Sequence, residues 1–454
     1  MKDKNKTVYI THCVDAEGPL RESLPATFER IKDVFSIELE PCHEVLKKLQ
    51  NREIDLGAKT DIVAKFVDPS LIAYNDTWDK IDKMMSKIMN RNFRNLLPDS
   101  FGNGWIFNWH CVDHVGYDTN PRERTIGYHS IYDRYVEFLD KYSCTGIDAI
   151  EWHFHPMSTY REAHRCATSY ENSPHLHQIL CRRVLERGVF PAVYRAGFQA
   201  ERPDSHWFLE QWIPFDCTNM AIDNPEEFEL QNDFKNGRSG DWRRAPSDWS
   251  VYQPDFYDYQ KQGGCRRYIG RFLNINTRIA NITQKETDKA FKNAADGVDV
   301  LLGVTNHDFR DMISEIDYVR DLISNSARKY PDIQFKYCKA KDAFNAVVHN
   351  DKYENLELDV QLYREDGFYK LRIYTKNSKV FGPQPYLAIK TKSGRFIHDN
   401  FDFGLDGKSW HYVFDTDTVL SSDLDEVGVA ANNKYGDTFI KQIKITKSTE
   451  GING

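Results

Sequence analysis

Between residue 7 and about residue 345, short apolar runs alternate with segments whose apolar residues recur every three or four positions. This alternation predicts βα units rather than an all-α or all-β domain. Helices are predicted over residues 44–50, 78–91, 130–142, 175–187, 205–212, 285–296 and 313–329, and strands over residues 8–14, 105–109, 147–152, 192–194, 215–217, 272–275, 298–304 and 334–337. Parallel strands in such number favour a closed or nearly closed α/β barrel whose site lies at the strand C-termini.

The pattern changes after about residue 351 to an alternation with period two. Six runs follow it, and turn dipeptides such as Asp366-Gly367 and Asp406-Gly407 separate them, which predicts a small all-β sandwich. We therefore expect a barrel over residues 1–349 and a separate sandwich domain over residues 350–454. Binding of glycan, oligomerisation and bracing of the barrel are all open as roles for the sandwich. Residues 224–264 lack periodicity and are expected to form an insertion near the site.

Composition and charge restrict the possible partners. Of the 454 residues, 40% are hydrophobic and 13% aromatic, and the formal net charge is −8 at pH 7. This is ample material for packed cores, whereas an acidic chain has no strong basic field to attract DNA or RNA. We therefore expect no nucleic-acid partner.

The cysteines and the first residues bear on the compartment. Nine cysteines are scattered without a CxxC pair, which indicates neither a disulfide framework nor a zinc ribbon. Residues 1–6 are polar and leave no room for a secretory signal before the first strand, and no apolar stretch is long enough to cross a bilayer. The expectation is a cytoplasmic protein without a membrane span. Its oligomeric state does not follow from the sequence.

Candidate chemistry lies where predicted strands end. Asp15 and Glu17 are two positions apart, so strand alternation would point both carboxylates to the same side. One could bind a divalent ion while the other takes a proton from water that the ion activates. Taken without the other motifs, Asp15 and Glu17 could instead be a solvated acidic pair in a loop.

A pair of histidines follows another predicted strand. His153 and His155 are also two apart, and Pro156 stiffens the exit from the strand. Two imidazoles from one face of an extended segment, together with one carboxylate, form a ligand set used by Zn²⁺ and other divalent metals. The sequence therefore predicts a metal site between this strand end and the one that carries Asp15 and Glu17.

Four motifs in order carry a family resemblance: Val14-Asp-Ala-Glu17, Glu151-Trp-His-Phe-His-Pro156, Tyr194-Arg-Ala-Gly197 and Asn306-His-Asp308. Residues 7–345 resemble the NodB-homology polysaccharide deacetylases, the carbohydrate esterase family 4 superfamily. The resemblance implies a distorted (β/α) barrel of about seven strands. It also implies a metal-dependent amide hydrolase that acts on carbohydrate.

The resemblance assigns metal ligands. Glu17 takes the place of the family's usual second aspartate, and His153 and His155 match its metal-binding histidine motif. The family spaces those histidines four apart, whereas here they are two apart, so His110, His114 or His164 could take the place of the first ligand. Zn²⁺ is the metal expected first, with Co²⁺, Mn²⁺, Ni²⁺ and Fe²⁺ as alternatives.

The resemblance also assigns catalytic roles. It implies Asp15 as the catalytic base, Arg195 as the arginine that pairs with this base, and His307 as the general acid. An arginine at that position could keep Asp15 ionised and oriented, and Gly197 would allow close approach of the backbone. Asp308 is expected to cap the turn that follows it.

Other side chains are candidates for contact with a sugar. Trp105, Trp109, Trp152, Trp242 and Trp249 could form stacking walls for a pyranose ring, although core positions are the alternative for most of them. Arg238, Arg243 and Arg244 in the insertion could receive phosphates of a nucleotide or lipid carrier, or simply be solvated.

Together these observations predict a metal-dependent N-deacylase, a deacetylase or deformylase, that hydrolyses the amide of an N-acylated sugar during assembly of a surface polysaccharide. The sugar could be free, nucleotide-linked or lipid-linked. Two alternatives stay open: a non-catalytic glycan-binding protein of the same fold, and a metal-independent glycoside hydrolase that uses paired carboxylates.

Overall fold

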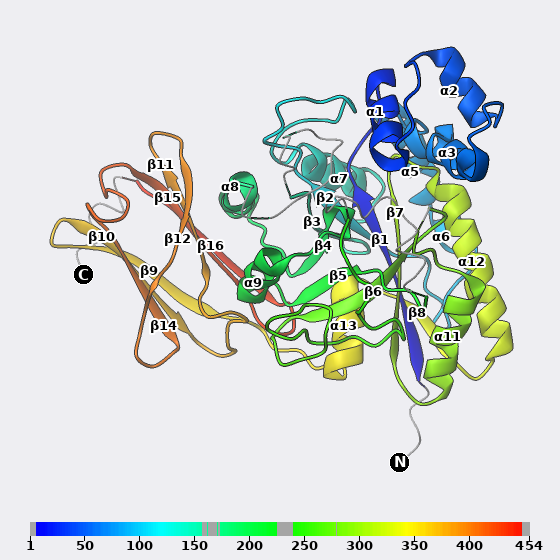
Figure 1. Ribbon diagram of the computed structural model, residues 1–454. Helices are drawn as coiled ribbons and strands as arrows, with labels where there is room; N and C mark the ends of the chain where they lie inside the picture. Colours follow the sequence, from blue (N-terminus) through cyan, green and yellow to red (C-terminus); the bar gives the residue numbers. More distant parts are fainter. Residues whose placement is uncertain are drawn as a thin grey trace.

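A parallel β-barrel with an outer layer of helices forms the larger part of the protein, and antiparallel sheets form the C-terminal part (Figure 1). The computed structural model describes residues 6–156, 161, 170, 173–224, 239–277 and 279–446. The barrel strands are β1 (Thr7–Ala16), β2 (Phe107–Val112), β3 (Ala149–Phe154), β4 (Val193–Ala196), β5 (Phe215–Asn219), β6 (Tyr268–Asn274) and β7 (Val300–His307).

Closure of the barrel depends on β1. One edge of β1 pairs with β7 along its length, from Val8 opposite Val300 to Asp15 opposite His307. Its other edge pairs with β2 in the second half of the strand and with β8 (Gln334–Tyr337) in the first half. The seven strands β1 to β7 therefore form a closed ring, and the predicted barrel of about seven strands is confirmed.

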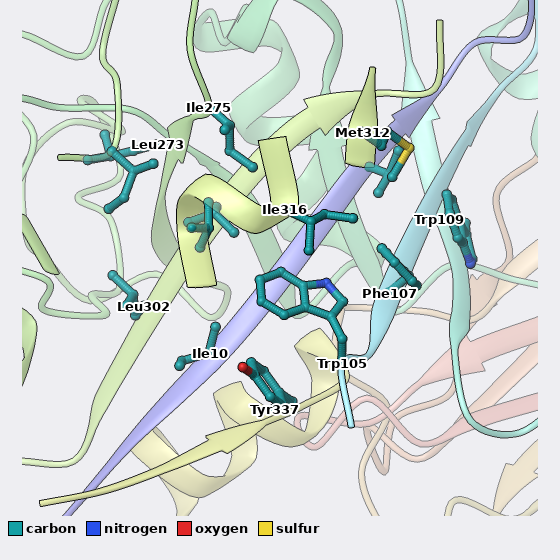
Figure 2. Packing of buried hydrophobic residues seen from close by; sticks show 14 of the residues in the cluster. Ile10, Trp105, Phe107, Trp109, Leu273, Ile275, Leu302, Met312, Ile316 and Tyr337 are labelled. Carbon is teal, nitrogen blue, oxygen red and sulfur yellow. The ribbon is translucent and has the colours of Figure 1, made fainter. Parts of the chain in front are cut away.

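The helices pack against the outside of the barrel. Figure 2 shows Met312 and Ile316 of α12 beside Trp105 and Phe107, which belong to the same buried cluster. Such amphipathic helices cover the outward face of a parallel sheet. None of the described helices is long and apolar enough to span a bilayer. The helices of this layer are α5 (Trp78–Ile88), α6 (Arg91–Arg94), α7 (Ser130–Lys141), α8 (His175–Arg182), α9 (Pro203–Trp212), α11 (Gln284–Ala295) and α12 (Met312–Lys329).

The barrel interior is filled by side chains and closed at one end by a helix that the sequence analysis did not predict. This helix, α13 (Ala340–His349), places Phe344 against Phe215, with ring centroids 4.8 Å apart. Phe215, Phe272 and Leu301 belong to the same buried cluster as Phe344. Because α13 contacts β1, β5 and β7, and Phe344 packs with residues at the starts of strands such as Val193 and Phe215, α13 covers the amino ends of the strands.

Short helices between β1 and β2 form a cap at the end of the barrel toward which β1 points (Figure 1). Their apolar side chains form a cluster of their own, which includes Phe28, Ile31, Val63 and Phe66. Of these helices only α2 was predicted, because the apolar faces of the others pack against one another in this separate cluster rather than against the barrel. They are α1 (Leu24–Phe35), α2 (His43–Gln50), α3 (Thr60–Phe66) and α4 (Pro69–Ile72).

The predicted C-terminal all-β part is present. One sheet has the order β13-β14-β10-β9 and the other the order β12-β11-β15-β16, both antiparallel. At the predicted turn between the first two strands, Asp366 and Gly367 both have positive φ, 54° and 86°. The strands are β9 (Leu358–Glu365), β10 (Phe368–Thr375), β11 (Tyr386–Thr391), β12 (Phe396–Asp399), β13 (Asp402–Phe403), β14 (Ser409–Phe414), β15 (Leu424–Asn432) and β16 (Thr438–Lys444).

The second of these sheets packs against the barrel's helical layer. Tyr386 of β11 lies in one buried cluster with Leu180 of α8 and Trp212 of α9. Asn432 at the end of β15 donates hydrogen bonds to the backbone carbonyls of Pro191 and Trp212, at 2.7 and 2.9 Å. The two parts of the chain therefore share a packed interface rather than a flexible tether.

Candidate metal centre

The strand register places the candidate residues at one level of the barrel. Asp15 on β1 lies opposite His307 on β7, and His153 on β3 lies opposite Arg195 on β4. Because side chains alternate along a strand, these inward positions face the barrel interior near its carboxyl end. Glu17 and His155 follow two residues later on their own segments and so lie one layer nearer the mouth.

Glu17, His153 and His155 form a group that could hold a metal ion. The two Nε2 atoms of the histidines are 2.9 Å apart, and Glu17 Oε1 is 3.3 Å from His155 Nε2 and 3.9 Å from His153 Nε2. Ligand atoms 2.0–2.2 Å from one tetrahedral Zn²⁺ lie about 3.3 Å from one another. The three separations bracket that value, so the residues fit a single divalent ion.

The hydrogen bonding of His153 leaves the correct nitrogen available for a metal. Its Nδ1 lies 2.9 Å from the backbone carbonyl oxygen of Arg195. A carbonyl oxygen only accepts, so Nδ1 carries the proton and Nε2 of the neutral ring has a free lone pair. Burial lowers the pKa of His153 to about 3, although Asp15 opposes this effect, and the ring is therefore neutral at physiological pH.

Glu17 is held by an arginine that the sequence analysis missed. Arg124 Nη2 donates to Glu17 Oε2 at 2.5 Å, which leaves Oε1 directed at the histidines. Burial opposes ionisation of Glu17, but Arg124 and then His155 outweigh it and hold the pKa of this carboxyl well below its usual value. Arg124 lies in a loop between β2 and α7, where no periodic pattern marks it.

Arg195 holds Asp15 beside the histidines. Its Nε donates to Asp15 Oδ1 at 2.7 Å, and its Nη1 donates to the backbone oxygen of Cys217 at 2.8 Å. The side-chain oxygen of Gln199 accepts from Nη2 at 2.6 Å. Burial works against ionisation of Asp15, but Arg195 and then His153 outweigh it, so the pKa of Asp15 is lowered.

His307 lies near both carboxylates. Its Nε2 lies 3.7 Å from Asp15 Oδ2 and 3.7 Å from Glu17 Oε1. The ring packs against Phe309, with centroids 4.8 Å apart, and Nδ1 has no hydrogen-bond partner among the described residues. Burial lowers the pKa of His307 to about 4 despite the two carboxylates, so its resting form is neutral.

Asp308 has a different role from the predicted turn cap. Its carboxylate accepts from the backbone N–H groups of Glu17 and Gly18, at 3.0 and 2.8 Å, and from the hydroxyl of Tyr135 at 2.8 Å. Burial raises the pKa of Asp308 to about 7, although the two N–H groups favour its charged form. The prediction was wrong because the donors come from the segment after β1 and from α7, which only the tertiary structure brings near.

Gly197 allows His155 to reach the site. A Cβ at position 197 would lie 2.4 Å from His155 Cδ2, closer than any side chain could tolerate. The next two residues, Phe198 and Gln199, have positive φ of 53° and 48°, which non-glycine residues seldom adopt. The segment after β4 is therefore strained where it packs against His155 and Arg195.

The suggested substitutes for the first histidine lie elsewhere. His110 is deeper in the barrel, where its Nε2 is 3.1 Å from Cys13 Sγ. His114 Nε2 lies 3.0 Å from the backbone oxygen of Glu17 and so is directed at the loop rather than at its carboxylate. His164 falls outside the described residues.

A second buried group could also hold a metal: Cys13, His110 and Cys217. All three residues are fully buried, and none of them lines the pocket at the barrel mouth. Burial raises the pKa of Cys13, but the Cys217 thiol and His110 beside it outweigh this and lower it. Because it is enclosed, this group lacks the access to substrate that the Glu17 group has.

A pocket of about 200 Å³ opens onto the Glu17 group. Glu17, His155 and His307 line it, together with Phe198 and Phe309. The five tryptophans proposed as stacking walls are at most 3% exposed and belong to the cores, so that prediction was wrong. Trp109 and Trp152, for example, alternate with His110 and His153 along their strands and so point away from the barrel interior.

The arginines proposed as a phosphate site also lie away from this pocket. Arg243 pairs with Asp241 at 2.9 Å and Arg244 pairs with Asp258 at 2.6 Å, in a separate hollow. Arg238 lies outside the described residues. The described part of the insertion does approach the site, since Trp242 Nε1 donates to the backbone oxygen of Gln199 at 2.9 Å.

Fold and site together define an α/β-barrel protein with a candidate metal centre at the carboxyl ends of its strands. In comparisons with protein-family models and with curated protein sequences, nothing matches this chain. A function for this chain is therefore proposed from the geometry of the site.

Proposed function

We propose that this protein is a metal-dependent N-deacylase that hydrolyses the amide of an N-acylated sugar. One observation carries the proposal: Asp15, which Arg195 holds ionised at 2.7 Å, lies next to the Glu17, His153 and His155 group without belonging to it. A base that is separate from the ligand set, at the edge of an open pocket, is what metal-assisted hydrolysis requires.

A divalent ion held by Glu17, His153 and His155 would polarise the amide carbonyl and stabilise the negative charge that develops on its oxygen. Asp15 takes one proton from the attacking water, whose oxygen forms the new bond to the acyl carbon. That proton then moves from Asp15 to His307, whose Nε2 lies 3.7 Å from Asp15 Oδ2, and His307 delivers it to the amine nitrogen as the carbon–nitrogen bond breaks. The lowered pKa of His307 fits this order, because a neutral imidazole must first gain the proton that it delivers.

The size of the pocket and the ligand set bear on the substrate and the metal. A pocket of about 200 Å³ is small beside the roughly 300–1,000 Å³ of typical ligand sites, and it therefore suits one sugar ring. Acetyl and formyl are both candidate acyl groups, and Zn²⁺ is the first candidate metal because two imidazoles and a carboxylate suit it. Assembly of a surface polysaccharide, a cytoplasmic location and the absence of a nucleic-acid partner stay predictions.

The glycoside-hydrolase alternative is less compatible with the charges. Such an enzyme needs one carboxyl group that stays protonated and donates a proton to the leaving oxygen. Here Arg195 and Arg124 outweigh burial, and the pKa values of both Asp15 and Glu17 are lowered rather than raised. Neither carboxyl group is therefore suited to act as the acid.

The test combines metal analysis with an assay for released acyl group. Purified protein is expected to bind one divalent ion per chain and, with Zn²⁺, Co²⁺ or Mn²⁺, to release acetate or formate from N-acylated aminosugars. The His153→Ala/His155→Ala double variant should lose the ion and the activity. Asp15→Asn should keep the ion and lower kcat by about 10²–10⁴-fold, because the base is lost and the ligands remain.

His43→Ala provides the control, since His43 is an exposed histidine at the start of α2. It should bind the metal and turn over as the unaltered protein does. Acyl release that persists in strong chelator would contradict the proposal. Loss of the ion in Asp15→Asn would reverse the roles assigned to Asp15 and Glu17, and a stoichiometric ion without activity on any acylated sugar would favour the glycan-binding alternative.

A further inference from the structure

One wall of the pocket carries two arginines, Arg30 and Arg122, that the chemistry proposed above does not use. Arg30 from α1, with Arg122 and Arg124 from the loop between β2 and α7, line the same pocket as His155 and His307. Arg310 lines it as well. Among the described lining residues there are thus four arginines, and Glu17 is the single carboxylate.

Two of these arginines share one carboxylate. Arg30 Nη1 donates to both oxygens of Glu22, at 2.8 and 2.6 Å, and Arg122 Nε donates to Oε2 at 3.0 Å. The Glu22 side chain is fully buried, whereas those of Arg30 and Arg122 are 8% and 12% exposed. The acid thus lies behind the guanidinium groups, and the wall presents an excess of positive charge to the pocket.

The other two pocket arginines do not reduce that excess. Arg124 is committed to Glu17, and Arg310 forms an ion pair with Glu315. Burial lowers the pKa of Arg122 to about 10. The positive charge of Arg30 adds to this effect, whereas the negative charge of Glu22 opposes it. Like charges in a poorly solvated wall repel one another, and a bound anion would relieve this repulsion.

The wall is also held in place before any ligand binds. The backbone N–H groups of Arg21 and Ser23 donate to the carbonyls of Arg122 and Pro121, at 3.3 and 3.0 Å, and tie the two segments together. The Arg30 guanidinium lies 4.4 Å from the centroid of the Phe66 ring. Preorganised guanidinium groups bind carboxylate and phosphate oxygens with little loss of side-chain freedom.

We propose that Arg30 and Arg122 bind an anionic group of the substrate, so that the N-acylated sugar carries a phosphate or a carboxylate. This inference rests on the proposed deacylase function for the sugar itself. The anion lies on the arginine wall while the amide faces His155 and His307, which line the same pocket. A sugar phosphate and an acidic sugar supply the same oxyanion chemistry.

The test measures binding rather than turnover. Metal-loaded full-length protein with Asp15→Asn is titrated by calorimetry with N-acetylglucosamine, its 1-phosphate, its 6-phosphate and N-acetylmuramic acid. At least one charged sugar is expected to bind about tenfold more tightly than the neutral one, since each ionic hydrogen bond contributes on that scale. A gain restricted to phosphates identifies a sugar phosphate, and a gain restricted to N-acetylmuramic acid identifies an acidic sugar.

Arg122→Gln, which leaves the pair between Arg30 and Glu22 intact, should remove the preference for the charged sugar. Arg244→Gln is the matched control, because Arg244 also pairs with one carboxylate but lies in the separate hollow. It should keep the preference. Equal affinity for neutral and charged sugars, no binding of any charged sugar, or a preference that survives Arg122→Gln would overturn the inference.

The outcome can be distinguished from failure of the deacylase proposal. If charged sugars bind through Arg122 but the protein with Asp15 intact releases no acyl group, the anion site is supported and the deacylase function is contradicted. If neutral and charged sugars are deacylated equally well and Arg122→Gln changes neither rate, the deacylase stands and the anion site fails.

Discussion

Asp308 Oδ1 accepts a hydrogen bond from the backbone N–H of Glu17 at 3.0 Å, although 291 positions separate the two residues. The same carboxylate binds the N–H of Gly18 and the hydroxyl of Tyr135. The residue that follows β7 thereby fixes the conformation of the segment that follows β1. The direction of the Glu17 side chain consequently depends on a group that contacts neither metal nor substrate.

We predict that Asp308→Ala lowers the free energy of unfolding by roughly 2–4 kcal/mol, because it leaves two backbone N–H groups and a hydroxyl without their acceptor. Metal affinity should fall about 10–100-fold, the range for groups that orient metal ligands. Tyr135→Phe, which removes one of the three hydrogen bonds, should cost about 1 kcal/mol. Urea denaturation and metal titration measure both effects, and unchanged metal affinity in Asp308→Ala would contradict the proposed support of Glu17.

Gly197→Ala should displace His155 without unfolding the protein. The added Cβ would lie 2.4 Å from His155 Cδ2, so the imidazole must move away from Glu17. Metal affinity should fall at least as far as in Asp308→Ala. Gly264→Ala is the control, since nothing lies within 4 Å of a Cβ at that position, and it should bind metal normally. Normal metal binding by Gly197→Ala would show that His155 is not a ligand.

Replacement of Arg195 should affect both stability and the pH profile. Arg195→Gln leaves Asp15 buried without its charged partner, and we expect a loss of roughly 3–5 kcal/mol in the free energy of unfolding. Since Arg195 lowers the pKa of Asp15, its removal raises that pKa, and the acid limb of the rate profile should shift to higher pH. Arg187→Gln, at an exposed pair with Asp133, should change stability by less than about 1 kcal/mol. An acid limb that does not move would argue against Asp15 as the base.

The interface between barrel and sandwich should weaken in acid. His177 of α8 and His398 of β12 stack with ring centroids 4.5 Å apart. Burial lowers the pKa of His177 to about 4, and burial and then His177 lower that of His398 to about 3. In the unfolded chain both histidines have a pKa of about 6.5, so between that pH and their folded pKa values the unfolded state binds more protons than the folded state. The contribution of these histidines to the free energy of unfolding is therefore fully present above about pH 6.5 and is lost as the pH falls.

Each of these histidines can change the free energy of unfolding by at most about 1.4 kcal/mol per pH unit. The change should be smaller than this limit because both rings are partly exposed. Urea denaturation between about pH 7 and pH 4.5 measures the slope. His398→Phe should reduce it, whereas His43→Phe, at an exposed position on α2, should not. Equal slopes in the two variants would show that the stacked pair does not control acid stability.

Local pattern was sufficient for much of the fold. The predicted strands and helices are present because their apolar periodicity matches the face that each buries, as in α7 and α12. The period-two runs after residue 351 became antiparallel strands for the same reason. The helix α13 was missed, although Ala340, Ala343 and Phe344 have helical spacing, because its apolar face covers the end of the barrel rather than its side.

The sequence alone determined that Asp15 and Glu17 share one side of their segment at the end of a predicted parallel strand, and that His153 and His155 do the same on another, because side chains two positions apart in an extended segment point the same way. Only the tertiary structure decided that Arg124 binds the Glu17 carboxylate and that Asp308 accepts from the Glu17 backbone N–H. It also decided that Arg30 and Arg122 share the buried carboxylate of Glu22. Those contacts join loops whose conformations are set by packing between distant segments, and no periodic pattern in the sequence encodes such packing.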